Sequence, residues 1–151
     1  WAAVRSLRDE VNRNLELARA EKALGASLEA KVLLHCADPA VSEALARWSG
    51  ASNGVDELRF LFLTSQVALV ASATEVTERS LFSSTREEGP AATVGIAAAD
   101  GTKCERCWHF DPQEQSQTYE GVCPRCETSL SLMGVAPRQR RAAAAAGYFG
   151  E

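Results

Sequence analysis

The chain has 151 residues, of which 46% are hydrophobic and 24% are charged, and its formal net charge is −4 at pH 7. This apolar fraction supports a packed core and excludes a generally disordered chain, while the negative charge argues against a protein that coats nucleic acid by charge alone. No apolar run reaches the roughly 18–20 residues that a membrane-spanning helix needs, so no membrane partner is expected.

The first predicted element is an amphipathic helix over residues 2–22. Gly25 is expected to supply the left-handed residue that ends it. We expect the apolar face of the helix to pack on a sheet that contains residues 57–70. The residues of this face recur at steps of three and four, and they are Val4, Leu7, Val11, Leu15 and Ala18.

A strand and a second helix are predicted next. Residues 29–36 form a run that is typical of a strand and ends before Asp38 and Pro39. Asp38 is suited to the N-cap of a helix, and Pro39 is suited to its first turn. Cys36, at the end of the strand, is predicted to be a buried thiol without reactivity. The apolar side of the second helix would consist of Val41, Leu45 and Trp48.

The following part of the chain predicts strands and a loop. Residues 57–64 and 66–70 are rich in Leu, Phe and Val, which indicates one or two strands. Residues 71–91 are polar and rich in Ser and Thr, so we expect a loop there. Residues 93–97 predict another short strand that leads towards a group of cysteines.

This order of elements predicts the α+β fold class, in three parts. A small helix-plus-sheet domain would occupy residues 1–99, and a four-cysteine zinc-ribbon or knuckle module would occupy residues 100–130. Residues 131–151 would be an extension of unknown role, with three arginines and five consecutive alanines. The chain begins with Trp1 rather than Met, and we expect it to be the C-terminal part of a longer protein.

Four of the five cysteines form two Cys-x-x-Cys pairs, Cys104 with Cys107 and Cys123 with Cys126, which fifteen residues separate. A two-residue gap lets one tight turn present two sulfurs to one ion, and two such turns complete a tetrahedral shell with no position for water. The pattern therefore predicts one structural Zn²⁺ bound by these four cysteines. An iron centre, a redox dithiol and two disulfides are the alternatives.

Four side chains beside these cysteines are candidate RNA contacts: Lys103, Arg106, Trp108 and Arg125. Arg106 and Arg125 each precede the second cysteine of a pair, so they could instead reduce the negative charge of a thiolate–zinc centre. Trp108 could either cover the cysteines and the adjoining sheet or stack on an RNA base. His109 is not needed as a ligand, because four cysteines already complete the shell.

Four linked motifs resemble those of the bacterial and organellar isoleucyl-tRNA synthetases. Residues 103–108 (KCERCW) are similar to the K-C-x-R-C-W signature that opens the zinc-binding end of that family, and residues 123–126 (CPRC) are similar to its second cysteine pair. Residues 8–19 resemble the family's R-x-x-V-x-x-x-L-E-x-A-R helix, and residues 24–30 resemble its I-G-x-S-L-E-A turn. The resemblance covers residues 1–130 in the right order.

The resemblance implies a zinc-containing, tRNA-binding C-terminal domain of an isoleucine–tRNA ligase, which helps to hold the anticodon end of the isoleucine tRNA. Its partners would be that tRNA and the rest of the synthetase. ATP would bind only in the distant catalytic domain of the parent enzyme, since this chain has no His-x-Gly-His or Lys-Met-Ser-Lys-Ser motif and hence no catalytic site of its own. The compartment would be the bacterial cytoplasm or an organelle interior, either chloroplast stroma or mitochondrial matrix.

A second hypothesis is a repurposed synthetase-derived domain that acts as a structural or docking subunit of a larger assembly. The acidic balance of the chain and its unusual tail suggest this alternative. A free-standing zinc-ribbon enzyme is disfavoured, because no cluster of candidate acid, base and nucleophile side chains is present.

Overall fold

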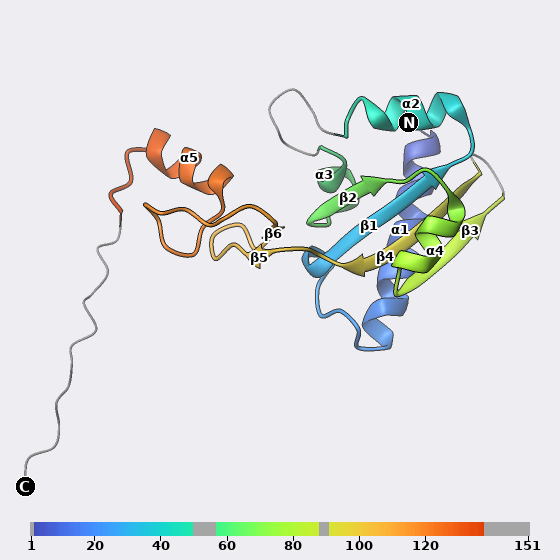
Figure 1. Cartoon of the computed structure of the whole chain (residues 1–151), viewed down its shortest axis with the longest axis horizontal. Coiled ribbons are helices and arrows are strands. Elements are labelled where there is room, and N and C mark those ends of the chain that lie inside the picture. The colour runs from blue at the N-terminus through green and yellow to red at the C-terminus, as the bar shows by residue number, and fades with distance from the viewer. Residues whose placement is uncertain (1, 50–56, 88–90, 138–151) are drawn as a thin grey trace, which may run out of the picture.

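The computed structural model describes residues 2–49, 57–87 and 91–137. Within these ranges, a four-stranded sheet carries helices on both faces, and a short hairpin followed by one helix extends from one end of it (Figure 1). The expected α+β class with a four-cysteine module is confirmed. None of the described helices is long and apolar enough to cross a membrane.

The sheet is mixed and has the strand order β2-β1-β4-β3. β1 (Ala30–Cys36) pairs in parallel with β2 (Gln66–Leu69) and antiparallel with β4 (Ala92–Ala98). β3 (Phe82–Arg86) completes the sheet by antiparallel pairing with β4. The predictions of strands at 29–36, 66–70 and 93–97 are therefore confirmed to within one residue at each end.

α1 (Ala2–Ala20) covers one face of the sheet with the stripe that its periodicity predicts. Its contacts are concentrated on β4 and β3 rather than on β2, and it also touches α3. Val4, near the N-terminal end of the helix, is only half-buried. The buried members of the stripe are Leu7, Val11, Leu15 and Ala18.

The chain leaves α1 through a left-handed residue, but this residue is Lys22 (φ 57°) and not Gly25. The backbone N–H of Ala23 donates to the carbonyl oxygen of Ala18, so the turn closes earlier than expected. Gly25 instead donates its N–H to Glu29 Oε2 at 2.8 Å.

α2 (Pro39–Ala46) begins as predicted, because Asp38 Oδ1 accepts the N–H of Ala40 at 2.9 Å and that of Val41 at 3.4 Å. This bonding satisfies two N–H groups that have no partner within the helix. Leu45 is buried in the core, and Val41 and Trp48 pack against it as partly buried side chains.

The predicted strand at 57–64 is wrong, since residues there form the short helix α3 (Leu58–Phe62). Leu58 and Phe62 are fully buried, and their spacing of four places both on one side of a helix turn. A short apolar run does not by itself distinguish a helix from a strand. Leu63 then ends the helix in a left-handed conformation, with φ 56°.

The predicted loop at 71–91 is also wrong, because α4 (Ala73–Arg79) and β3 lie within it. Ser72 caps α4 by accepting the N–H of Glu75 at 3.1 Å, and Val76 is fully buried. α4 covers the sheet face opposite α1, in contact with β4 and β1 (Figure 1). β3 is an edge strand with alternating exposure, so its Ser and Thr residues suit a position that sees solvent.

The second part of the molecule consists of β5 (Thr102–Lys103), β6 (Phe110–Asp111) and α5 (Pro124–Leu132). Its buried residues form a cluster that is separate from the core of the sheet and helices: Cys104, Tyr119, Val122, Cys123 and Cys126. Residues 138–151, which make up most of the predicted extension, lie outside the described residues.

Hydrogen bonds join the β5–β6 hairpin to the end of the sheet. Ser65 Oγ accepts the N–H of Phe110 at 2.8 Å and donates to the carbonyl oxygen of Leu28 at 2.5 Å. The side chain of Gln66 accepts the N–H of Asp100 at 3.0 Å and donates to its carbonyl oxygen at 2.8 Å. The hairpin is thus held against the start of β2.

Candidate metal centre

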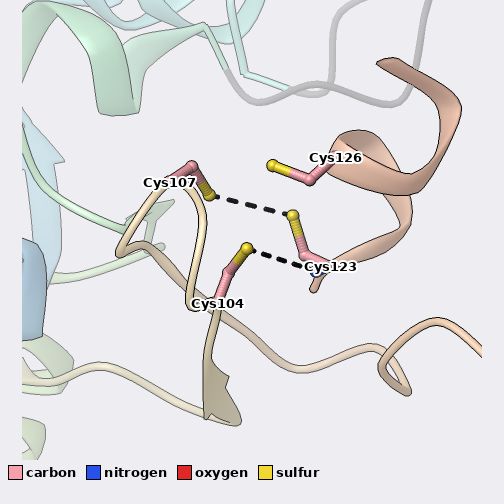
Figure 2. Close-up of side chains that lie close together, drawn as sticks. All are labelled: Cys104, Cys107, Cys123 and Cys126. Atoms are coloured by element: carbon pink, nitrogen blue, oxygen red, sulfur yellow. Dashed lines mark hydrogen bonds between the residues drawn. The ribbon is translucent and has the colours of Figure 1, made fainter. Parts of the chain in front are cut away.

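The four cysteine side chains converge between the hairpin and the first turn of α5 (Figure 2). Their sulfur atoms all lie within 4.8 Å of one another, and only Cys107 is partly exposed. Cys107 Sγ and Cys123 Sγ are 3.8 Å apart. A tetrahedron with metal–sulfur bonds of about 2.3 Å has sulfur–sulfur edges of about 3.8 Å, so this donor set fits one thiolate-bound ion such as zinc.

The two Cys-x-x-Cys turns are held together by backbone hydrogen bonds. Cys123 donates its N–H to Cys104 Sγ at 3.3 Å, and Glu105 donates its N–H to the carbonyl oxygen of Gly121 at 2.8 Å. Gly121 has φ +75°, a left-handed backbone conformation that favours glycine at this crossing. Cys123 is also the N-cap residue of α5.

The sulfur positions exclude the disulfide alternative for this structure. All five cysteines are free, and the 3.8 Å between Cys107 Sγ and Cys123 Sγ is far longer than a disulfide bond of about 2.05 Å. The arrangement is that of ligands around an ion.

The pKa values of the Cys104 and Cys123 thiols differ strongly. Burial raises the pKa of Cys104, but backbone N–H groups of Cys107, Cys123 and Arg106 outweigh it and lower the value to about 6. Burial, hydrogen bonds with neighbouring sulfurs and repulsion from Cys107 raise the pKa of Cys123 to about 12. Burial also raises the pKa of Cys126. Full ionisation of the cluster therefore requires a compensating cation.

The two arginines of the pairs lie where they reduce this negative charge. Arg106 Nη1 donates to Cys126 Sγ at 3.5 Å. Burial lowers the pKa of Arg125, but the bond to Cys107 and the attraction of the other thiolates outweigh it and raise the pKa. The sequence allows two roles for these arginines, and their contacts with sulfur support the role of reducing the negative charge of the cysteine cluster.

Trp108 does not cover the cysteines. Its side chain is 62% exposed, and its backbone is left-handed with φ 65°, which is uncommon for a bulky residue. Lys103 Nζ lies 5.6 Å from the centre of the indole ring. Of the two roles that the sequence leaves open for Trp108, covering the cysteines does not fit so exposed a side chain.

His109 faces α3 rather than the sulfur cluster. Its Nδ1 lies 3.1 Å from the carbonyl oxygen of Cys107, and its ring meets the ring of Phe60 edge to face, with centres 6.0 Å apart. Burial lowers the pKa of His109, and the positive charges of Arg59 and Arg125 lower it further. His109 is not among the four grouped ligands, as the sequence predicts.

Cys36 lies apart from this cluster, at the end of β1. It is half-buried rather than buried as the sequence predicts, because it packs against the edge of the core and not within it. Burial raises the pKa of its thiol, and the charge of Asp38 raises it further. The thiol therefore stays protonated at neutral pH, in keeping with the predicted lack of reactivity.

Phe60 and Arg59 are site neighbours that the sequence interpretation missed. Both lie on α3, which was predicted to be a strand, and they reach the cysteine turns only through folding. The spacing of four between Leu58 and Phe62 could have predicted a helix turn, with Phe60 on the opposite side of it.

Comparison with known proteins finds relatives among the isoleucine–tRNA ligases. No family model matches the chain. Among curated proteins, the chain is 41% identical to the isoleucine–tRNA ligase of Microcystis aeruginosa over 86% of its length, and 42% identical to that of Acaryochloris marina over 84%. It is 41% identical to the chloroplastic/mitochondrial isoleucine–tRNA ligase of Arabidopsis thaliana over 83% of its length. The chain is related to the isoleucine–tRNA ligases of bacteria and organelles.

The chain spans 14%, 13% and 12% of the lengths of these three isoleucine–tRNA ligases. The predicted resemblance to the isoleucine–tRNA ligases of bacteria and organelles is confirmed and is consistent with a C-terminal region, and the similarity supports an aminoacyl-tRNA synthetase domain. These relatives are ligases, and none supports the alternative of a docking subunit.

Proposed function

We propose that this chain is the tRNA-binding region of an isoleucine–tRNA ligase and aids recognition of the anticodon end of the isoleucine tRNA during aminoacylation. The observation that carries the proposal is Trp108, whose exposed ring stands beside the cysteine cluster with Lys103 above it. Adenylation of isoleucine with ATP would take place in the catalytic domain of the parent protein. The compartment would be bacterial cytoplasm, chloroplast stroma or mitochondrial matrix, in line with the sources of the relatives.

The metal in this proposal is one structural Zn²⁺, bound by Cys104, Cys107, Cys123 and Cys126. Four thiolates with no position for water are typical of a structural zinc site. The ion would fix the two turns that carry the RNA-contacting side chains. We propose the same division as the sequence indicates, with a domain at 1–99, a zinc module at 100–130 and an extension at 131–151.

The proposed RNA contacts are Lys103, Arg106, Trp108 and Arg125. An unstacked anticodon base needs only a small area of protein, because stacking on one aromatic ring and a few charge-assisted hydrogen bonds suffice to hold it. A patch of this size is compatible with the acidic net charge of the chain. The partners would be the isoleucine tRNA and the rest of the synthetase.

The test is replacement of Trp108 by Ala in the intact parent enzyme. Loss of one stacked base should weaken binding of the isoleucine tRNA by about 1–3 kcal/mol, while adenylate formation from isoleucine and ATP stays unchanged. Leu81→Ala is a matched control, since Leu81 is also exposed but precedes β3, away from the cysteines. Normal kcat/KM for charging by a folded, zinc-loaded Trp108→Ala enzyme would refute the proposal.

A further inference from the structure

We propose that a second surface, formed by Phe60, Arg59, Arg125 and His109 and called here the Phe60 surface, binds an additional nucleotide of single-stranded RNA. The base would stack on the ring of Phe60, and the guanidinium of Arg59 would hold a phosphate. This inference rests on the proposed function and extends the RNA contact from the cysteine turns onto α3.

The geometry of the Phe60 surface places two cations on one exposed ring. Phe60 is 42% exposed. The guanidinium carbons of Arg59 and Arg125 lie 5.0 and 5.5 Å from the centre of its ring, which is within the range of a cation–π contact. Arg59 comes from α3 and Arg125 from α5, so two distant parts of the chain build the surface together.

Within the described part of the chain, no carboxylate forms an ion pair with the cations of the Phe60 surface. The ion pairs found there join Arg19 to Glu16, Lys31 to Asp100 and Arg79 to Glu75, all outside this surface. The Nε atom of Arg59 is buried and has no hydrogen-bond partner among the described residues. Arg59 therefore offers positive charge to an anion, whereas Arg125 is already bonded to Cys107.

The chemistry of the Phe60 surface favours a nucleotide over an acidic peptide. A carboxylate would need the guanidinium groups but not the exposed ring near them, whereas a nucleotide uses both a ring for its base and a cation for its phosphate. His109 packs on Phe60 and directly follows Trp108 in the chain, so the two exposed rings flank the same turn. Phe60 on α3 and Trp108 on the cysteine turn would then each stack on one base of an unpaired loop.

The experiment measures binding of a fluorescein-labelled anticodon stem-loop of isoleucine tRNA to the zinc-loaded 151-residue chain at several salt concentrations. Phe60→Leu removes the ring but keeps apolar bulk, and we expect the Kd to rise about 5- to 100-fold. Arg59→Gln should also weaken binding and should reduce the slope of log Kd against log salt by about 0.7, the value for one phosphate contact on a single strand. Arg59→Lys should restore the slope, and Phe60→Leu should leave it unchanged.

The outcomes separate this inference from the proposed function. Arg79→Gln and Leu81→Ala are the controls for charge and for apolar bulk, and both should bind as the unaltered chain does. If Trp108→Ala loses binding while Phe60→Leu and Arg59→Gln match the controls, the Phe60 surface is refuted and the proposed function stands. If none of the three variants changes the Kd, the proposed function fails and the inference fails with it. Weakened binding by Arg59→Gln with an unchanged salt slope, or equal competition by a polyglutamate peptide, would also overturn the inference.

Discussion

At the scale of single residues, the first Cys-x-x-Cys turn serves both the metal and the surface. Its backbone N–H groups point at the sulfur of Cys104, which lowers the pKa of that thiol to about 6. The same turn brings Trp108 into a left-handed conformation, and its ring faces outward. One loop therefore stabilises a thiolate on its inner side and presents an aromatic ring on its outer side.

The unequal pKa values predict how zinc affinity depends on pH. Zinc binds thiolates, so protons compete with it. For each proton that is released on binding, the logarithm of the zinc association constant rises by about one for every unit of pH. Around neutral pH, Cys123 and Cys126 are protonated in the metal-free chain and must each lose a proton on binding. Below the Cys104 pKa of about 6, that thiol also carries a proton, and the pH dependence should become steeper.

Competition titrations against a zinc chelator across this pH range will measure that slope. Cys36→Ser is the matched control, because Cys36 lies in β1 and is not one of the four grouped ligands. Its slope should equal that of the unaltered chain. A zinc affinity that does not change with pH would contradict four-thiolate binding.

At the scale of elements, the close approach of α4 to the sheet depends on Gly95 in β4. A Cβ at this position would lie 1.8 Å from Ser80 Oγ and 2.6 Å from Val76 Cγ1. Gly95→Ala should therefore push α4 away from the sheet and lower the free energy of unfolding by about 1–3 kcal/mol. Urea denaturation measures the change.

The double variant Gly95→Ala with Ser80→Ala is the control for this contact. It removes the nearest atom but leaves the approach to Val76, so it should recover only part of the lost stability. Full stability of Gly95→Ala alone would show that α4 is free to shift without cost.

The elements that the sequence predicts well are those whose pattern is long or capped. α1 has five turns of consistent periodicity, and α2 has an Asp38–Pro39 start that is specific to helices. α3 is a single short turn whose apolar run is equally compatible with a strand. β3 is polar because it lies at the edge of the sheet, and an edge position is a property of the tertiary fold and not of the local sequence.

The same distinction applies to the candidate site. The four cysteines are predictable because each pair is local, and a metal needs only two such pairs. The outward position of Trp108 follows from the left-handed backbone at that residue, which no spacing of residue types reveals. The contact of Phe60 with His109 and Arg125 joins three segments of the chain, so only the folded structure brings it to light.

At the scale of the whole molecule, the sheet and the cysteine module have separate buried clusters but share a hydrogen-bonded junction. Ser65 and Gln66, at the start of β2, hold Phe110 and Asp100 of the hairpin region. The sheet has its own apolar core, whereas few apolar side chains accompany the cysteines. Metal binding should therefore matter far more to the hairpin and α5 than to the sheet.

Replacement of Cys104 by Ser tests this difference. The variant should lose zinc, because one of the four sulfur ligands is gone, and residues 100–130 should unfold, since so small a cluster cannot fold without its metal. The sheet and the helices packed on it should keep their own core. Hydrogen exchange followed by mass spectrometry should show lost amide protection in the hairpin and α5, with protection retained in β1 and β4. The control Cys36→Ser should keep both its zinc and its full amide protection. If Cys104→Ser loses protection in β1 and β4 as well as in the hairpin, the sheet depends on the metal too.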